Sequence, residues 1–118
     1  MEGNRAQPGG GQPGTEQALL PGMILSNEPG YYKAGEYGIR IENLVLVVPR
    51  AIPGAEGEFY GFETLTFAPI EKRLVDTALL TEEETAWWNA YHARVNELIG
   101  PQLDGAAKTW LEEQCVPL

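Results

Sequence analysis

Two glutamates, Glu28 and Glu42, stand inside stretches of the sequence that are otherwise apolar. Glu28 follows the apolar run 23–25, and Glu42 lies within the largely aliphatic segment 39–48. An ionised carboxylate in such a segment is unfavourable unless positive charge compensates it. Divalent cations supply that charge, because they take oxygen donors and because two neighbouring cations need bridging carboxylates to reduce their repulsion. The pair therefore predicts a metal site at which both acids meet.

The first acid is predicted at the end of a strand. Residues 23–25 lead into Glu28, and the following Pro29 and Gly30 cannot continue a hydrogen-bonded ladder. The glycine-containing loop 31–38 then predicts a hairpin-like return of the chain. The end of a strand is a common place for a functional side chain, so this position favours a site.

The second acid is predicted inside a longer strand over residues 39–48. A period of two places Arg40 and Glu42 on the same face of this strand. Apolar side chains occur on both faces, which predicts a strand that is covered on both sides. Pro49 is expected to end it, because proline has no amide hydrogen to donate.

A purely structural explanation of the two acids remains open at this point. Glu28 could cap a turn, and Glu42 could form an ion pair with Arg40 or Lys33. Acid and base pairs in protein interiors also arise without any catalytic role. The spacing of the residues alone does not choose between this explanation and a metal site.

Two motifs around these acids identify a family that the chain resembles. The sequence N-E-P-G-Y-Y at 27–32, followed by G-I-R-I-E-N at 38–43, resembles the end of the catalytic domain of the pita-bread metallopeptidases, in particular the X-prolyl aminopeptidases (aminopeptidase P). The resemblance runs from about Gly14 to the C-terminus, because residues 61–70 and 87–92 are similar to the long, cytosolic-type form. It implies an α+β fold, the C-terminal portion of a pita-bread fold, with antiparallel strands followed by two C-terminal helices.

The resemblance also implies roles for four residues. In the family, two aspartates, one histidine and two glutamates, in that chain order, hold two metal ions, usually manganese or zinc. Glu28 matches the first glutamate, which binds one metal together with the histidine, and Glu42 matches the second, which bridges both. Tyr32 and Arg40 match positions that orient these carboxylates, in keeping with the general need to fix metal ligands.

The activity that the resemblance implies belongs to the complete domain. It is the removal of an N-terminal residue that precedes proline, so the substrate is a peptide with proline at its second position. Two divalent cations activate water and polarise the scissile carbonyl in such a site. A carboxylate at the position of Glu28 can also pass a proton between the nucleophile and the leaving amine.

Three of the five implied ligands have no counterpart upstream of Glu28. The aspartates of the chain are Asp76 and Asp104 and its one histidine is His92, all of them downstream. Since two carboxylates leave most coordination positions to water, we expect weak or absent metal binding and no activity in this chain alone. The expected partners are the missing N-terminal half or a second copy in a homodimer, and the alternative function is a noncatalytic binding or complementation module.

The chain divides into three segments. Residues 1–13 are rich in glycine and proline, do not resemble the family and are expected to form a disordered tail. Residues 14–70 are expected to form the C-terminal strands of the metallopeptidase catalytic domain, and residues 71–118 a helical extension. The break near Gly14 indicates a truncated gene product, a fragmentary gene prediction or a deliberately cut piece.

Composition sets broader limits. A chain of 118 residues with 43% hydrophobic residues suits one domain with a modest core. A net charge of −9 argues against binding to nucleic acid or anionic membranes. The longest aliphatic run, 44–48, is far too short to span a bilayer, and the N-terminus lacks a secretory pattern. Because the single cysteine, Cys115, excludes an internal disulfide, we expect a reducing, cytoplasmic location.

A third strand is predicted over residues 58–69, where alternation places Glu63 on an aromatic-rich face. Glu63 could approach the metal site or the peptide. A carboxylate that pairs with an arginine or lysine is the preferred interpretation, because unpaired charges are rarely buried.

Two helices are predicted after this strand. The sequence 81–84, T-E-E-E, is a capping box that predicts a helix start, and Gly100-Pro101 predicts its end. Apolar residues at helical spacing define the expected buried stripes: Trp87, Trp88, Tyr91, Val95, Leu98 and Ile99, then Leu103, Ala107, Trp110, Leu111 and Cys115. His92 lies next to the first stripe and is interpreted as a helix-surface or half-buried residue rather than a metal ligand.

Overall fold

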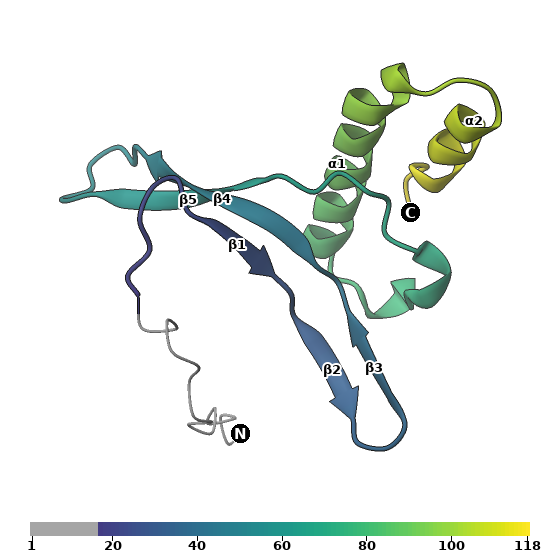
Figure 1. The fold of residues 1–118 in the computed structure, drawn as a ribbon, viewed down its shortest axis with the longest axis horizontal. Coiled ribbons are helices and arrows are strands. Elements are labelled where there is room, and N and C mark those ends of the chain that lie inside the picture. The colour runs from purple at the N-terminus through teal and green to yellow at the C-terminus, as the bar shows by residue number, and fades with distance from the viewer. Residues whose placement is uncertain (1–16) are drawn as a thin grey trace.

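The computed structural model describes residues 17–118, and the tail expected over 1–13 lies outside the described residues. The described part is mixed α and β, with strands first and helices after them (Figure 1). The strands are β1 (Ile24–Asn27), β2 (Gly30–Lys33), β3 (Tyr37–Arg40), β4 (Asn43–Arg50) and β5 (Phe59–Thr64). The helices are α1 (Glu82–Ile99), α2 (Gly105–Gln114) and the short 3-10 turns η1 (Lys72–Leu74), η2 (Thr77–Leu79) and η3 (Gly100–Gln102). The expected order of antiparallel strands followed by two helices is confirmed.

The five strands form one sheet and one arm. β4 is the centre of an antiparallel sheet with the order β1-β4-β5, and β2 and β3 pair with each other as a hairpin. The pairing register of the arm continues that of β1 with β4, because Asn27 pairs with Asn43 and Gly30 pairs with Arg40. The arm therefore extends the β1-β4 ribbon beyond the sheet, where Figure 1 shows it reaching away from the helices.

Several strand boundaries differ from those expected. The segment 39–48 is divided between β3 and β4, with residues 41–42 outside both strands. Part of the expected loop 31–38 belongs to β2 and β3, and the third strand, β5, is shorter than the predicted 58–69. Apolar alternation predicts that a strand exists, but hydrogen bonding to a neighbour decides where it ends.

Pro49 does not end its strand, contrary to expectation. β4 continues to Arg50, and Pro49 pairs with Tyr60 of β5. On the side of β4 opposite to β5, the Val47 amide donates a hydrogen bond to the carbonyl of Met23 at 2.9 Å. The backbone nitrogen of Pro49, two residues after Val47, points to the same β1 side of β4. The chain that precedes β1 no longer runs alongside β4 at this point, so the missing amide hydrogen of Pro49 breaks no ladder bond.

The sheet is covered on one face only within the described residues. Val45 and Val47 on one face of β4 are buried at 8% and 1% exposure, whereas Leu44 on the other face is 45% exposed. Ile39 and Ile41 share the valine face but lie at the arm, where they are 48% and 45% exposed. The expectation that this stretch is covered on both sides is therefore wrong for the part of the chain described. The helical region covers the valine face, and the opposite face is open.

The helix boundaries agree with the sequence signals. The Thr81 side chain accepts a hydrogen bond from the Glu84 amide, and the Glu84 side chain accepts one from the Thr81 amide, which completes the expected capping box. α1 ends at Ile99, immediately before Gly100 and Pro101. No helix in residues 17–118 combines the length and apolar character needed to cross a membrane.

The buried stripes are narrower than predicted. The core between the helices consists of Tyr91, Val95, Leu111 and Cys115, with partly buried neighbours that include Phe67 and Ile70. Trp87 and Trp110 are 53% and 54% exposed, although both were expected in the stripes. Helical spacing identifies an apolar face, but only the packed partners decide how wide its buried part is.

Candidate metal centre

Glu28 and Glu42 lie at the two breaks that separate the sheet from the arm. Because the register is the same on both sides of the breaks, Glu28 comes directly opposite Glu42. The amide of Ile41 donates to the carbonyl of Pro29 at 3.3 Å, which holds the two chains together between the strands. Directly opposite residues of an antiparallel pair point to the same face. The register thus places both carboxylates on one face of the ribbon, the face opposite to that covered by the helices.

Tyr32 and Arg40 belong to the same cluster. The pKa of Arg40 is raised, mainly by its hydrogen bond with the Tyr32 side chain, with further contributions from the negative charges of Glu28 and Glu42. The Tyr32 ring lies against Gly38, where a Cβ atom would come within 2.7 Å of the ring. A glycine is thus required for this close approach. All four predicted site residues gather around one guanidinium.

Neither acid is neutralised by a direct ion pair. Within residues 17–118, neither Glu28 nor Glu42 has a basic nitrogen within 4.0 Å of its carboxylate. Lys33 pairs instead with Glu36, at 2.8 Å. The alternative in which Glu42 pairs with Arg40 or Lys33 is therefore not the arrangement found, and the carboxylate oxygens stay open to a cation.

A cavity of about 230 Å³ adjoins Glu42. Arg40, Glu42 and Asn43 form one wall, and the segment 66–71 that follows β5 contributes the other. The Thr66 hydroxyl accepts a hydrogen bond from the Leu44 amide at 2.8 Å, so this segment is attached directly to the start of β4. The second acid thus borders a hollow between the start of β4 and the segment that follows β5.

The described residues supply part of a metal centre. They contain no group of three or more histidine, cysteine, aspartate or glutamate side chains placed to hold an ion. The donor set that is present, two facing carboxylates, suits hard and borderline divalent cations. The chemistry of Glu28 and Glu42 therefore fits the carboxylate part of a divalent-metal centre.

His92 is a structural residue. Its side chain is fully buried, with 0% exposure, rather than half-buried as expected. Its Nε2 accepts a hydrogen bond from the Ile70 amide at 3.0 Å, so the ring hydrogen resides on Nδ1, which donates to the Trp88 carbonyl at 2.9 Å. Both ring nitrogens are occupied by hydrogen bonds, so neither is available to a metal ion in the present arrangement.

Glu63 has no ion-pair partner among the described residues, so its predicted pairing with an arginine or lysine is wrong within that part. It pairs in register with Leu46 and is exposed. It therefore lies on the open face of the sheet. An open face accommodates a hydrated carboxylate without a partner.

Sequence reasoning missed a second charged feature beside the cavity. Glu71, one of the lining residues, accepts hydrogen bonds from Nε and Nη2 of Arg73 at 2.9 and 2.7 Å. These bonds, together with one from the Arg73 amide, lower the pKa of Glu71 to about 2. The E-K-R sequence at 71–73 is the only local signal for this pair.

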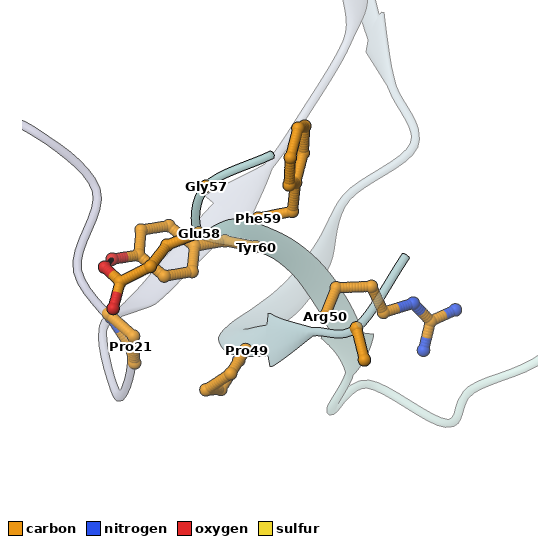
Figure 2. A pocket seen from close by; sticks show the side chains of 8 residues that line it. Pro21, Pro49, Arg50, Gly57, Glu58, Phe59 and Tyr60 are labelled. Carbon is orange, nitrogen blue, oxygen red and sulfur yellow. Dashed lines mark hydrogen bonds between the residues drawn. The ribbon is translucent and has the colours of Figure 1, made fainter. Parts of the chain in front are cut away.

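Another cavity, of about 270 Å³, lies at the opposite end of β4 (Figure 2). Its lining includes Pro21, Pro49, Arg50 and Phe59. None of the four predicted site residues reaches it. It brings together few groups that could do chemistry, since Arg50 points away from the remaining polar groups in Figure 2.

Comparison with known families is consistent with this geometry. Residues 2–49 match the metallopeptidase family M24, and residues 58–118 match the C-terminal region of peptidase M24. The first match begins well upstream of Gly14, so the family resemblance extends further toward the N-terminus than the sequence motifs indicated. The chain belongs to metallopeptidase family M24.

Within that family the similar proteins are X-prolyl aminopeptidases. The chain is 46% identical over 105 residues to a probable Xaa-Pro aminopeptidase P of Coprinopsis cinerea, an alignment that covers 86% of the chain and 17% of that protein. It is 45% identical over 108 residues to aminopeptidase P2 of Arabidopsis thaliana, covering 89% and 15%.

A solved structure shows the same similarity in three dimensions. The X-prolyl aminopeptidase of Caenorhabditis elegans, described as a cytosolic enzyme with a di-nuclear active site, superposes with a TM-score of 0.71 at 41% identity. The match covers 85% of the chain and 17% of that structure. The chain thus corresponds to the C-terminal part of a pita-bread aminopeptidase fold and spans about a sixth of the length of the relatives it matches.

Proposed function

We propose that Glu28 and Glu42 are the two glutamate ligands of a dinuclear metal centre in an X-prolyl aminopeptidase. The observation that carries this proposal is the register, which sets the two acids opposite each other at matched breaks in the ribbon. Their lack of ion pairs within the described residues adds to it, because the carboxylate oxygens remain available to a divalent cation.

Four residues of this chain have different roles in the proposed site. Glu28 and Glu42 would hold the ions, manganese or zinc by the family resemblance, with Glu42 in the role of the family's second, shared glutamate. Arg40 restrains both carboxylates through its charge, and Tyr32 holds the guanidinium through its hydroxyl. When bound, two such metal ions would supply Lewis acidity and an activated water for peptide hydrolysis. Glu28 would be placed to pass a proton to the leaving amine.

The proposed substrate is a peptide with proline at its second position, and the proposed location is the cytoplasm. The names of the similar proteins support this substrate, and the description of the nematode enzyme as cytosolic supports the location. The chain alone contributes two of the five ligands that the resemblance implies. We therefore propose that it is inactive by itself and binds metal weakly.

A chimera tests the proposal. The matching C-terminal part of the nematode enzyme is replaced by this chain, and hydrolysis of an X-Pro peptide is measured with added manganese. We expect turnover by the chimera and none by the isolated chain. Glu28→Gln and Glu42→Gln should each lower kcat by at least about 100-fold, since each removes a ligand charge.

Glu56→Gln is the matched control, because Glu56 is an exposed acid outside the site. It should leave the kcat of the chimera unchanged. Substantial turnover by the isolated chain would contradict the claim of inactivity. Retained turnover in both site variants, with a well-folded chimera, would contradict the roles of the two acids.

The second candidate function is a noncatalytic binding or complementation module. The specific observation in its favour is the open apolar face, on which Ile24 and Leu44 are 60% and 45% exposed. The fitting occupant is the upstream part of an M24 catalytic domain, because the chain spans so little of its relatives. A second copy in a homodimer is the competing occupant.

Association measurements test this candidate. The chain is mixed with the upstream part of the nematode enzyme, and the mass of the complex is determined by analytical ultracentrifugation. We expect a one-to-one complex that Leu44→Glu weakens. A mixture that sediments as separate components would rule out complementation, and a dimer of the chain alone would support the homodimer.

A further inference from the structure

Tyr91 of α1 connects the helical region to the candidate metal centre. Its hydroxyl lies 2.8 Å from the Ala68 carbonyl, 3.3 Å from the Thr66 carbonyl and 3.4 Å from Oδ1 of Asn43. The residue is 8% exposed and packs in the core between the helices. A phenol has one hydrogen to donate, which the Ala68 carbonyl accepts at the shortest distance, and the Thr66 carbonyl and Oδ1 of Asn43 lie around the same hydroxyl as further acceptors.

The partners of this hydroxyl flank the second acid. Asn43 directly follows Glu42 in the chain, and it pairs in register with Asn27, which directly precedes Glu28. Alternation along the strand sends the Asn43 side chain to the helix side while Glu42 faces the opposite side. A contact that restrains Asn43 on the helix side of the sheet thus also restrains the backbone that carries the Glu42 side chain.

The remaining contacts hold the wall of the cavity beside Glu42. Segment 66–71 forms that wall, and the same phenol hydroxyl binds its Thr66 and Ala68 carbonyls. His92, the next residue of α1, accepts the Ile70 amide at 3.0 Å. Two adjacent residues of one helix therefore restrain three points of the wall.

We propose that Tyr91 is a positioning residue for the metal centre, through which α1 keeps Glu42 and the cavity wall in place. This inference rests on the proposed function of Glu42. If Tyr91 acts in this way, the helical region supports the structure of the metal centre and is not independent of it. A side chain that acts in this way changes the local stability around Glu42 more than the stability of the whole fold.

Amide hydrogen exchange of the metal-free chain tests the restraint directly. Tyr91→Phe removes the hydroxyl and keeps the ring, which stacks on Trp87 at 5.3 Å. We expect exchange at the Leu44 and Ile70 amides to accelerate about fivefold more than at Val47 in the middle of β4. A uniform acceleration, or none, would overturn the proposal.

Two control variants separate this effect from general destabilisation. Tyr60→Phe removes a hydroxyl that binds Glu58 at 3.3 Å, toward the far end of the sheet, and should leave the exchange around Glu42 unchanged. Leu111→Val loosens the same core without touching the phenol hydroxyl. It should change exchange evenly, and a Leu44-specific change in this variant would contradict the special role of Tyr91.

Manganese titration then separates this inference from the proposed function. Paramagnetic broadening of the Glu42 amide signal gives the affinity, and we expect Tyr91→Phe to weaken it about tenfold. If manganese does not broaden this signal in the unmodified chain, the proposal that the chain alone binds metal weakly fails, while the exchange data still decide whether Tyr91 restrains the strand. If manganese binds equally well to both proteins, the positioning role is wrong.

Discussion

The helical region and the β2-β3 arm differ sharply in how they are stabilised. In the helical region His92 and Val95 are completely buried, and Leu111 is 2% exposed. Every residue of β2 and of β3 is exposed. The arm nevertheless carries Tyr32 and Arg40, so residues of the candidate site stand where the chain has the least packing of its own. Most of the packing within the described residues thus lies in the helical region, the candidate site residues lie in the arm and at its breaks, and the start of β4 connects the two.

A leucine-to-alanine substitution in each region tests the difference in packing most directly. Leu111→Ala should lower the free energy of unfolding by about 3 kcal/mol, because it leaves a cavity in the core between the helices. Leu44→Ala, on the open face at 45% exposure, should cost under about 1 kcal/mol. Urea unfolding measures both, and equal costs would show that the sheet face is buried in solution.

The buried histidine gives the next largest effect. His92→Leu should destabilise the fold by about 2 kcal/mol, since the Ile70 amide loses its acceptor in a buried position. His92→Gln keeps an acceptor and should cost less. Thermal unfolding with and without manganese measures both variants. A metal-dependent stability that disappears only in the His92 variants would contradict a structural role.

A substitution at Thr81 tests how much the capping box contributes to the stability of the helical region. Thr81→Ala removes the side-chain acceptor for the Glu84 amide and should cost about 1 kcal/mol. Thr81→Ser retains the hydroxyl and serves as the matched variant. Urea unfolding followed by circular dichroism provides the measurement. Equal losses in both variants would mean that the hydroxyl is not the stabilising group.

The smallest expected effect is a pH dependence of stability that arises from the Glu71–Arg73 pair. The pKa of Glu71 is lowered from 4.5 to about 2, so its contribution is complete above 4.5 and is lost as the pH falls toward 2. The stability difference between the unmodified chain and Glu71→Gln should therefore close over that interval. Melting temperatures across the range measure it, with Glu56→Gln as control. A difference that does not depend on pH would contradict the pairing.

The sequence could indicate that Glu28 and Glu42 flank paired strands, because the evidence for it is local, and their role as metal ligands stays a prediction. Proline and glycine set the end of the first strand, and alternation sets the face of the second. The capping box at Thr81 and the stop at Gly100 are equally local, and the structure places both as expected.

The features that were missed depend on distant contacts. Pro49 remains in its strand because the neighbouring chain leaves on its amide side, and Trp87 stays exposed because the helix packs along a narrower stripe. The Tyr91 hydroxyl reaches partners 23 to 48 residues away. No pattern in the sequence around Tyr91 contains that information.

The measurement that tests the central claim most directly is a map of manganese-induced broadening over the amide signals of the isolated chain. Paramagnetic broadening detects weak binding and locates the ion. The account predicts the strongest effect at Glu28 and Glu42, its loss in the double variant Glu28→Gln/Glu42→Gln, and its retention in Glu82→Gln/Glu83→Gln, which removes two acids from the start of α1. Broadening that centres on the start of α1, or that persists in the first double variant, would contradict the account.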